Sequence, residues 1–181
     1  AGETVRVIDN FATGRPENLA PFRECIAFYQ VDITDRAALD EPFRGVDYVL
    51  HQAAIPSVPR SVDDPLGTHD ANVNGTVNVL DAARRAGVRR VVYAASSSAY
   101  GDQPTLPKDE AMVPCPLSPY AASKLAGEYY CQAFTACYDD ASIDESNWAR
   151  LAAGHAGGVW HPVYPKGEDL LDDLVDLVYT Q

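Results

Sequence analysis

The sequence lacks the features that mark a membrane protein or a secreted protein. No segment approaches 18 consecutive apolar residues, so no membrane span is predicted. We predict no signal peptide, because no charged n-region followed by an apolar h-region opens the chain. The four cysteines form no C-x-x-C pair and show no metal-ligand spacing. We therefore expect a cytoplasmic protein with reduced thiols, several of them buried, and no bound metal.

Basic residues are also scarce. The chain has 14 Lys and Arg against 26 Asp and Glu, a formal net charge of −12. A nucleic-acid-binding face needs clustered basic residues to neutralise phosphates, so this balance argues against one. The one basic cluster consists of Arg84, Arg85, Arg89 and Arg90 and lies around the predicted end of a helix, where positive charge complements the helix dipole.

What the sequence does contain is an alternation of strand and helix patterns. The 181 residues suffice for one domain with a core. Apolar runs predict strands in residues 4–9, 25–34, 47–54 and 88–95. Helical patterns cover 35–43, 64–87 with a stop at Gly87, and 120 to about 138, and a proline-rich loop covers 101–119. Continuous apolar strands indicate a parallel sheet buried on both faces, so we predict an α/β, Rossmann-like doubly wound fold.

The domain organisation that we expect has two parts. Residues 1–138 form a Rossmann-like domain, and residues 139–181 form a divergent tail in which the strand–helix alternation is lost. "DLLDDLVDLVYT" near the end of the chain predicts a short amphipathic helix.

Polar residues gather where the predicted strands end. Asp9, Asp32, His51–Gln52 and Ser96–Ser98 each lie at the carboxyl end of a predicted strand, and doubly wound sheets bind ligands beyond these ends. Asp9 is equally consistent with an ordinary turn or cap, and Asp32 or Thr34 with a cap on the next helix. His51 is best explained as a hydrogen-bonded histidine at a strand end.

The segment "SPYAASK" places Tyr120 four residues before Lys124, on one face of the predicted helix. A nearby ammonium favours the phenolate, so the pair can exchange a proton with a sugar hydroxyl. Ser96, 24 residues before Tyr120, can donate to the same reacting oxygen. The plain alternatives are a surface helix and a serine-rich turn.

Six blocks together resemble the extended short-chain dehydrogenase/reductase family, and within it the NAD-dependent nucleotide-sugar epimerases and dehydratases. The blocks are "VIDNFATGRPENL", "VDITD", "VLHQAAIPSVPRSVDDP", "NVNGTVNVLDAAR", "YAASSSAYGD" and "SPYAASKLAGE". The amino-acid sequence of these blocks is most similar to that of the 4-epimerases of UDP-hexoses and UDP-N-acetylhexosamines. The resemblance implies that residues 1–138 are a partial NAD(P)-binding Rossmann domain.

The resemblance also implies residue roles, with NAD as the cofactor. Tyr120 is the expected acid/base, Lys124 tunes it and binds the nicotinamide ribose, and Ser96 is the hydroxyl partner. The adenosine ribose is expected at Asp9, Asn10, Thr13 and Gly14, and the adenine at Asp32 and Ile33. Gln52, Ala53 and Ala54 are expected to line the cofactor, and Asn72 to brace the catalytic loop. Substrate contacts are expected, more weakly, from Ser57, Arg60, Ser97 and Ser98.

The implied reaction is epimerisation at C4 of a UDP-sugar through a 4-keto intermediate. The family's 4,6-dehydratases carry Asp and Glu just after their catalytic threonine, and its decarboxylases usually keep the Glu. Ser97 and Ser98 stand at those places, which favours an epimerase over a dehydratase or a decarboxylase. Relatives are commonly dimers that pair through the Tyr–Lys helix, so a homodimer is expected.

The chain departs from the family pattern at both ends. It lacks the opening strand with its G-x-x-G-x-x-G turn, which holds the cofactor's pyrophosphate, and the C-terminal substrate domain. We therefore expect a truncated chain that binds NAD poorly by itself. The alternative is a non-catalytic remnant, or a Rossmann-like fragment that binds a partner protein.

Overall fold

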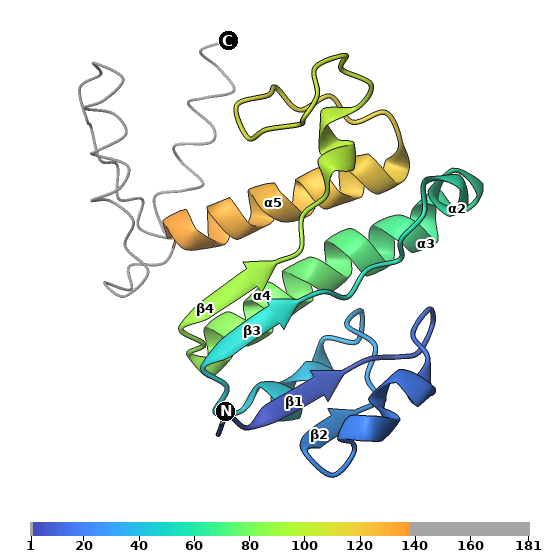
Figure 1. The fold of residues 1–181 in the computed structure, drawn as a ribbon. Coiled ribbons are helices and arrows are strands. Elements are labelled where there is room, and N and C mark those ends of the chain that lie inside the picture. Colours follow the sequence, from blue (N-terminus) through green and yellow to red (C-terminus); the bar gives the residue numbers. More distant parts are fainter. Residues whose placement is uncertain (1, 138–181) are drawn as a thin grey trace. The chain divides into compact units, whose positions relative to one another are not determined.

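The computed structural model describes residues 2–137 (Figure 1). The predicted tail, residues 139–181, and its terminal helix lie outside the described residues. Contacts divide the chain into two units, Ala1–Cys131 and Gln132–Gln181. Every side chain of the candidate site belongs to the first unit, which contains all four strands and the helices before residue 119.

Strands and helices alternate through the first unit as the sequence predicts. The strands are β1 (Val5–Ile8), β2 (Ile26–Tyr29), β3 (Tyr48–His51) and β4 (Arg90–Tyr93). The helices are α1 (Asp40–Phe43), α2 (Val58–Asp63), α3 (Pro65–His69), α4 (Gly75–Ala86) and α5 (Pro119–Cys137). Short 3₁₀ turns cover Pro16–Phe22, Ala37–Leu39 and Ser97–Tyr100, and a π turn, Asp70–Asn74, joins α3 to α4. The sequence patterns predicted neither the first 3₁₀ turn nor α2.

The strands pair in parallel, which confirms the α/β class. β1 pairs with β2, with Val5 opposite Ile26, and β3 pairs with β4, with Tyr48 opposite Arg90. Among the described residues these are two separate two-stranded sheets, and β1 and β3 are not hydrogen-bonded to each other. Each of these two strands therefore keeps one edge without a strand partner in the described part of the chain.

One face of the strands packs on a hydrophobic core formed by α1, α4 and the turn before α1. Leu39, Phe43 and Val79 lie at its centre, and Ile8, Val49 and Val91 of the strands pack against it. Figure 1 shows α4 running alongside β3 and β4. Alternate strand residues point away from this core.

The sequence predicts strands that are buried on both faces, and this prediction is wrong for β3. Leu50 is 70% exposed and Tyr48 is 63% exposed, because α1 and α4 cover only the opposite face. The expectation that several cysteines are buried fails too, since Cys25 and Cys115 are exposed.

No helix in residues 2–137 is long and apolar enough to cross a membrane.

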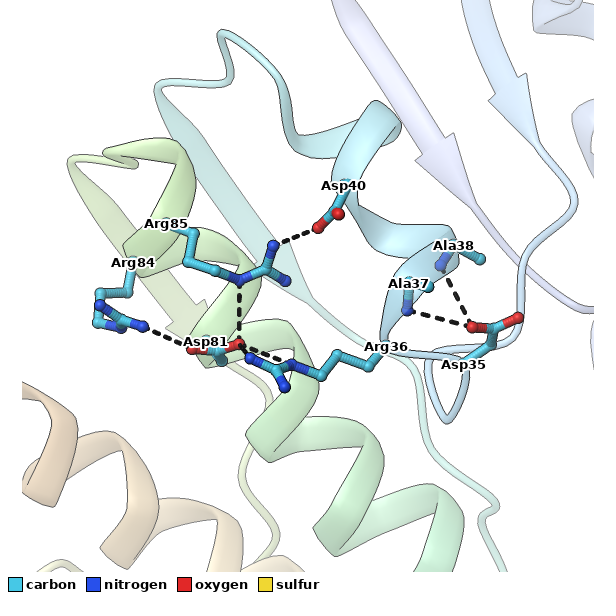
Figure 2. Close-up of polar contacts among 8 residues, drawn as sticks. All are labelled: Asp35, Arg36, Ala37, Ala38, Asp40, Asp81, Arg84 and Arg85. Atoms are coloured by element: carbon cyan, nitrogen blue, oxygen red, sulfur yellow. Dashed lines mark hydrogen bonds and ion pairs between the residues drawn. The ribbon is translucent and has the colours of Figure 1, made fainter.

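The arginines at the end of α4 are held by carboxylates (Figure 2). Asp81 accepts hydrogen bonds from Arg36, at 3.1 Å, and from Arg84 and Arg85, at 2.9 and 3.0 Å. Arg85 also pairs with Asp40, the first residue of α1. Burial of Asp81 works to raise its pKa, but the three arginines outweigh burial and hold the pKa below its ordinary value. The cluster thus ties α4 to the segment around α1 by charge.

We expect Asp81→Ala to lower the free energy of unfolding by about 1 kcal/mol, since the arginine side chains stay partly exposed and solvent screens the pairs. Urea unfolding at low salt and at about 1 M salt measures the loss, which should shrink at high salt. Asp47→Ala is the matched control, because the Asp47 side chain forms a single ion pair within residues 2–137, with Arg89 at the surface. An equal loss from both variants would contradict a role for the cluster.

Candidate active site

The loop after β1 folds back on Asp9. The Asp9 carboxylate accepts a hydrogen bond from the Phe11 backbone N–H at 2.7 Å. A Cβ added at Gly14 would lie 2.7 Å from the second carboxylate oxygen, so glycine lets the loop approach this closely. Asp9 thus forms a turn, as one of the two explanations from the sequence proposes, while Thr13 lies exposed on the loop. Residues 9–14 form one compact loop beyond the end of β1.

A hydrogen bond joins the loops after β1 and β2. The Asn10 side-chain amide donates to Asp32 at 2.7 Å. The other Asp32 oxygen accepts from the backbone N–H of Thr34 and from its hydroxyl. The Thr34 N–H lowers the pKa of Asp32, and the two side-chain hydrogen bonds add to this against the opposing effect of burial. Two of the residues predicted to meet the adenosine are therefore brought together, with Asp32 ionised at neutral pH.

The helical turn after Asp32 has its own cap. Asp35 accepts hydrogen bonds from the backbone N–H groups of Ala37 and Ala38 (Figure 2). The alternative that Asp32 or Thr34 caps this turn is therefore wrong. Ile33 instead lies so close to Gly75 that a Cβ there would be 2.6 Å from the Ile33 side chain. The loop after β2 thereby packs against the start of α4.

Asn72 joins the loop after β3 to helix α5. Its side chain is 1% exposed and accepts from the Ile55 N–H at 2.7 Å. Its amide donates to the Ile55 carbonyl at 3.2 Å and to the Ser123 hydroxyl at 3.0 Å. Asn72 lies in the π turn, a local widening of a helix that is frequent at functional sites. The loop that holds Gln52, Ala53 and Ala54 is therefore fixed at Ile55.

Two of the four weakly expected substrate residues, Ser57 and Arg60, lie together at the start of α2. Ser57 accepts a hydrogen bond from the Arg60 backbone N–H at 3.4 Å and caps the helix. Its φ of 103° is in the left-handed region, which a serine adopts at a cost in strain. Both residues are exposed. A Ser followed by Pro59 in the first turn is the signal that could have predicted α2.

The three serines after β4 open a short 3₁₀ turn. The Ser96 hydroxyl accepts from the Ser98 backbone N–H at 3.3 Å, so Ser96 is the cap of Ser97–Tyr100. Ser97 is exposed, and Ser96 and Ser98 are half-buried. Ser96 and Tyr120 are not joined by a hydrogen bond in the described part of the chain.

Helix α5 carries Tyr120 and Lys124. It begins at Pro119, one residue before its predicted start, and Ser118 accepts from the Ala121 N–H at 3.1 Å. Tyr120 is half-buried and Lys124 is 3% exposed. Residues four apart share a helix face, so the phenol and the ammonium lie on the same side of α5. Burial lowers the pKa of Lys124, and Glu128 and Cys131 oppose that effect.

Residues that sequence reasoning did not select surround this lysine. The Lys124 ammonium lies over the ring of Tyr93, 4.2 Å from its centroid. His51 lies beside the same ring, at 5.5 Å between centroids, and its Nε2 is 2.9 Å from the Thr76 hydroxyl. The Thr76 hydroxyl donates its proton to the Asn72 carbonyl, so His51 donates from Nε2. His51 is thus hydrogen-bonded at a strand end, as predicted.

We expect His51 to make the chain sensitive to acid. Burial lowers the pKa of His51 to about 4, and the charge of Lys124 adds to this. An unfolded histidine has a pKa of about 6.5, so at lower pH the proton binds more tightly to the unfolded chain. The free energy of unfolding is therefore highest above that pH and falls by roughly 3 kcal/mol as the pH drops through the folded pKa of about 4. Urea unfolding near pH 7 and near pH 4.5 measures the loss. His51→Gln should shrink it, and an unchanged loss in that variant would assign the acid sensitivity to other groups.

The fold and the residues at its strand ends define a class of protein. Parallel strands with polar side chains at their carboxyl ends are typical of a Rossmann-like nucleotide-binding fold. Within residues 2–137, no group of three His, Cys, Asp or Glu side chains is placed to hold a metal ion.

Residues 1–143 match the model of the NAD dependent epimerase/dehydratase family. The chain belongs to this family, whose cofactor is NAD. It is 43% identical over 143 residues to the UDP-glucose 4-epimerase of Mycolicibacterium smegmatis, a match that covers 76% of this chain and 45% of that one. The UDP-glucose 4-epimerase of Streptomyces lividans is 39% identical over 136 residues, covering 71% and 39%. The chain thus spans less than half the length of these relatives.

Solved structures show the same relationship. The UDP-glucose 4-epimerase of Thermotoga maritima, with UDP-glucose, matches with a TM-score of 0.69 and 31% identity, over 74% of this chain and 44% of that one. A double mutant of the dTDP-glucose 4,6-dehydratase of Streptomyces venezuelae, with NAD bound, matches with a TM-score of 0.73 and 34% identity, over 76% and 44%. Fold similarity alone therefore does not separate epimerase from dehydratase.

Proposed function

We propose that residues 1–137 are the cofactor-binding and proton-transfer part of an NAD-dependent UDP-sugar 4-epimerase. The observation that carries the proposal is the arrangement around helix α5. Tyr120 and Lys124 share one face of α5, and the Asn72 amide donates to Ser123 of that helix and holds Ile55 of the loop after β3. The names of the relatives supply the reaction class and the nucleotide sugar.

The described residues have the donors and acceptors that the adenosine of NAD needs. Asp9 and Asp32 follow β1 and β2, and the Asn10–Asp32 hydrogen bond joins the loops that carry them. Asp9 would accept hydrogen bonds from the ribose hydroxyls and repel a phosphate on the 2′ oxygen, which favours NAD over NADP, and Asp32 would lie at the adenine. Lys124 is the residue that would donate to the nicotinamide ribose.

In this proposal Tyr120 moves the proton of the sugar O4. Its deprotonated oxygen would take this proton and later return it to the ketone oxygen, while NAD, held by the residues named above, would supply the hydride acceptor and donor for the two faces of C4. Lys124, on the same face of α5, and Ser96, as a hydrogen-bond donor to the reacting oxygen, are the residues that we propose to support this transfer. Ser57 and Arg60, together at the start of α2, are our candidates for sugar contact.

The serine loop favours epimerisation over elimination of water. Removing water from a sugar needs a general acid and a base in addition to the proton-transfer tyrosine. Ser97 and Ser98 follow Ser96, at the two places where the 4,6-dehydratases that the chain resembles carry Asp and Glu. A serine hydroxyl does not supply that acid and base at neutral pH. Dehydratase and decarboxylase remain alternatives that product analysis distinguishes.

We infer that these residues alone do not catalyse the reaction efficiently. Its sequence contains no G-x-x-G-x-x-G turn to bind the pyrophosphate, and β1 and β3 each keep an unpaired edge in the described part. These features equally suit the alternative of a non-catalytic fragment that binds a partner. We also propose that α5, on which Tyr129 and Tyr130 are exposed, pairs with a second copy.

The test of the proposed function is a chimera. Residues 1–137 replace the matching stretch of the Mycolicibacterium smegmatis relative, which supplies the remainder. We expect the chimera to interconvert UDP-glucose and UDP-galactose, and the chain alone to do so barely or not at all. A folded chimera without epimerase activity would favour the non-catalytic alternative, and a dehydrated product would favour the dehydratase.

A further inference from the structure

Lys124 is a buried cation whose charge needs support from its surroundings. Within residues 2–137 no carboxylate forms a salt bridge with it. The ammonium lies over the face of the Tyr93 ring, with Nζ 4.2 Å from the centroid. An ammonium over an aromatic face is attracted by the negative charge of the π system, more strongly when water is excluded.

The Tyr93 ring is itself held in place. Its hydroxyl donates to the Lys124 backbone carbonyl at 3.3 Å. Gly127 lies one turn further along α5, and a Cβ there would be 2.3 Å from the Tyr93 hydroxyl oxygen. Glycine at 127 therefore leaves the room that the ring occupies. His51 contacts the ring as well, at 5.5 Å between centroids.

The other groups around the ammonium come from α5 and β3. Glu128 and Cys131 on α5 act to raise the pKa of Lys124, against burial, which lowers it. His51 on β3 is neutral near pH 7, because burial and the charge of Lys124 lower its pKa. Tyr120 lies near enough to Tyr93 to contribute to the raised pKa of that phenol, after burial, Cys131 and Glu128. The uncharged Tyr93 ring is thus the group that lies directly against the Lys124 ammonium.

We propose that Tyr93 is a positioning residue for the Tyr120–Lys124 pair: its ring face holds the Lys124 ammonium in its charged form and in place, and Gly127 provides the space that this contact needs. The inference deepens the proposed function and rests on it for the roles of Tyr120 and Lys124. The contact itself does not depend on NAD or on a sugar.

The experiment measures the pKa of the Lys124 ammonium in the full chain by NMR of isotope-labelled lysine. The chain has three lysines, at 108, 124 and 166, and Lys124→Arg assigns the signal. Tyr93→Leu removes the ring and should lower the Lys124 pKa by roughly one unit. Tyr93→Phe keeps the ring, so its Lys124 pKa should stay within about 0.3 units of the unmodified chain, because the cation–π contact is retained.

Circular dichroism and urea unfolding show whether each variant folds. Gly127→Ala is the second test, because its methyl group displaces the ring while Tyr93 and Lys124 both remain. It should lower the Lys124 pKa in the same direction as Tyr93→Leu, and it decides the question if Tyr93→Leu does not fold. A Lys124 pKa that neither variant changes, or one that Tyr93→Phe lowers as far as Tyr93→Leu, would overturn the proposal.

This readout separates the inference from the proposed function. The proposed function fails if the chimera is inactive, whereas the inference fails only on the pKa of Lys124. If the pKa responds as expected and the chimera is inactive, the contact between Tyr93 and Lys124 is established, but Lys124 has no role in an epimerase reaction.

Discussion

Tyr120→Phe should reduce the epimerase turnover of the chimera by about 10²- to 10⁴-fold, the range that a positioned acid/base contributes. The substitution removes only the phenolic oxygen from α5. Phenylalanine keeps the ring, so the packing of the half-buried side chain and the fold of α5 should be preserved. NAD affinity should change little, because the contacts proposed for the adenosine lie on the loops after β1 and β2.

The matched control for this substitution is Tyr129→Phe. Tyr129 lies on the same helix but is exposed, and it has no proposed part in proton transfer. Initial rates with UDP-glucose, with NAD binding measured on the same preparations, make the comparison. Tyr120→Phe turnover equal to that of the control would show that another group moves the proton.

Asn72→Ala should lower the free energy of unfolding by about 3 kcal/mol, since it leaves the Ile55 N–H without its buried acceptor and removes two further hydrogen bonds. In a chain of this size that corresponds to a fall in Tm of roughly 10 °C. The loss should be large because Asn72 holds the loop after β3 and α5 at once. Thermal and urea unfolding of the full chain measure it.

Asn74→Ala is the control in the same π turn. The Asn74 amide donates to Asp70 at 2.9 Å, one turn earlier and on the surface, so its loss should cost well under about 1 kcal/mol. In the chimera, Asn72→Ala should also weaken NAD binding, because the loop with Gln52, Ala53 and Ala54 loses its fixed point. Equal costs for the two variants would mean that Asn72 does not brace the loop.

The elements of the fold were predictable where periodicity and end signals agree. The strand that ends at Ile8, the helix that stops before Gly87 and the start of α5 near Tyr120 all lie within a few residues of their predicted bounds. The positions of Asp9, Asp32, His51 and Ser96 beyond or at strand ends follow from the same patterns. Each of these features is local in sequence.

The burial of the strands was not predictable in the same way. An apolar run such as "YVLH" indicates a strand with both faces covered, but a covered face needs elements that the run itself does not encode. In the described residues α1 and α4 cover one face, and Leu50 on the other is exposed. Hydropathy reports which residues favour burial, whereas the number of layers that surround a strand depends on the rest of the fold.

The site residues themselves stay a prediction, and the side chains that contact them in the structure were not predicted. In the sequence, Tyr93 and Thr76 look like ordinary strand and helix residues. The fold places Thr76 against His51 and Tyr93 against Lys124. Tyr93 and Lys124 lie 31 positions apart in the chain. A contact across that distance leaves no local spacing from which to predict it, although Gly127, inside a helix where glycine is unfavourable, is a signal that something approaches closely.

Calorimetric titration of NAD into the chimera, with NADH fluorescence measured after denaturation, tests the central claim most directly. The loops of Asp9 and Asp32, together with the remainder of the relative, should bind NAD at one site per chain, and Asp32→Ala should weaken that binding while the chimera stays folded. Tight binding that Asp32→Ala and Asp9→Ala both leave unchanged, or no binding to a folded chimera, would contradict a cofactor site at the ends of β1 and β2.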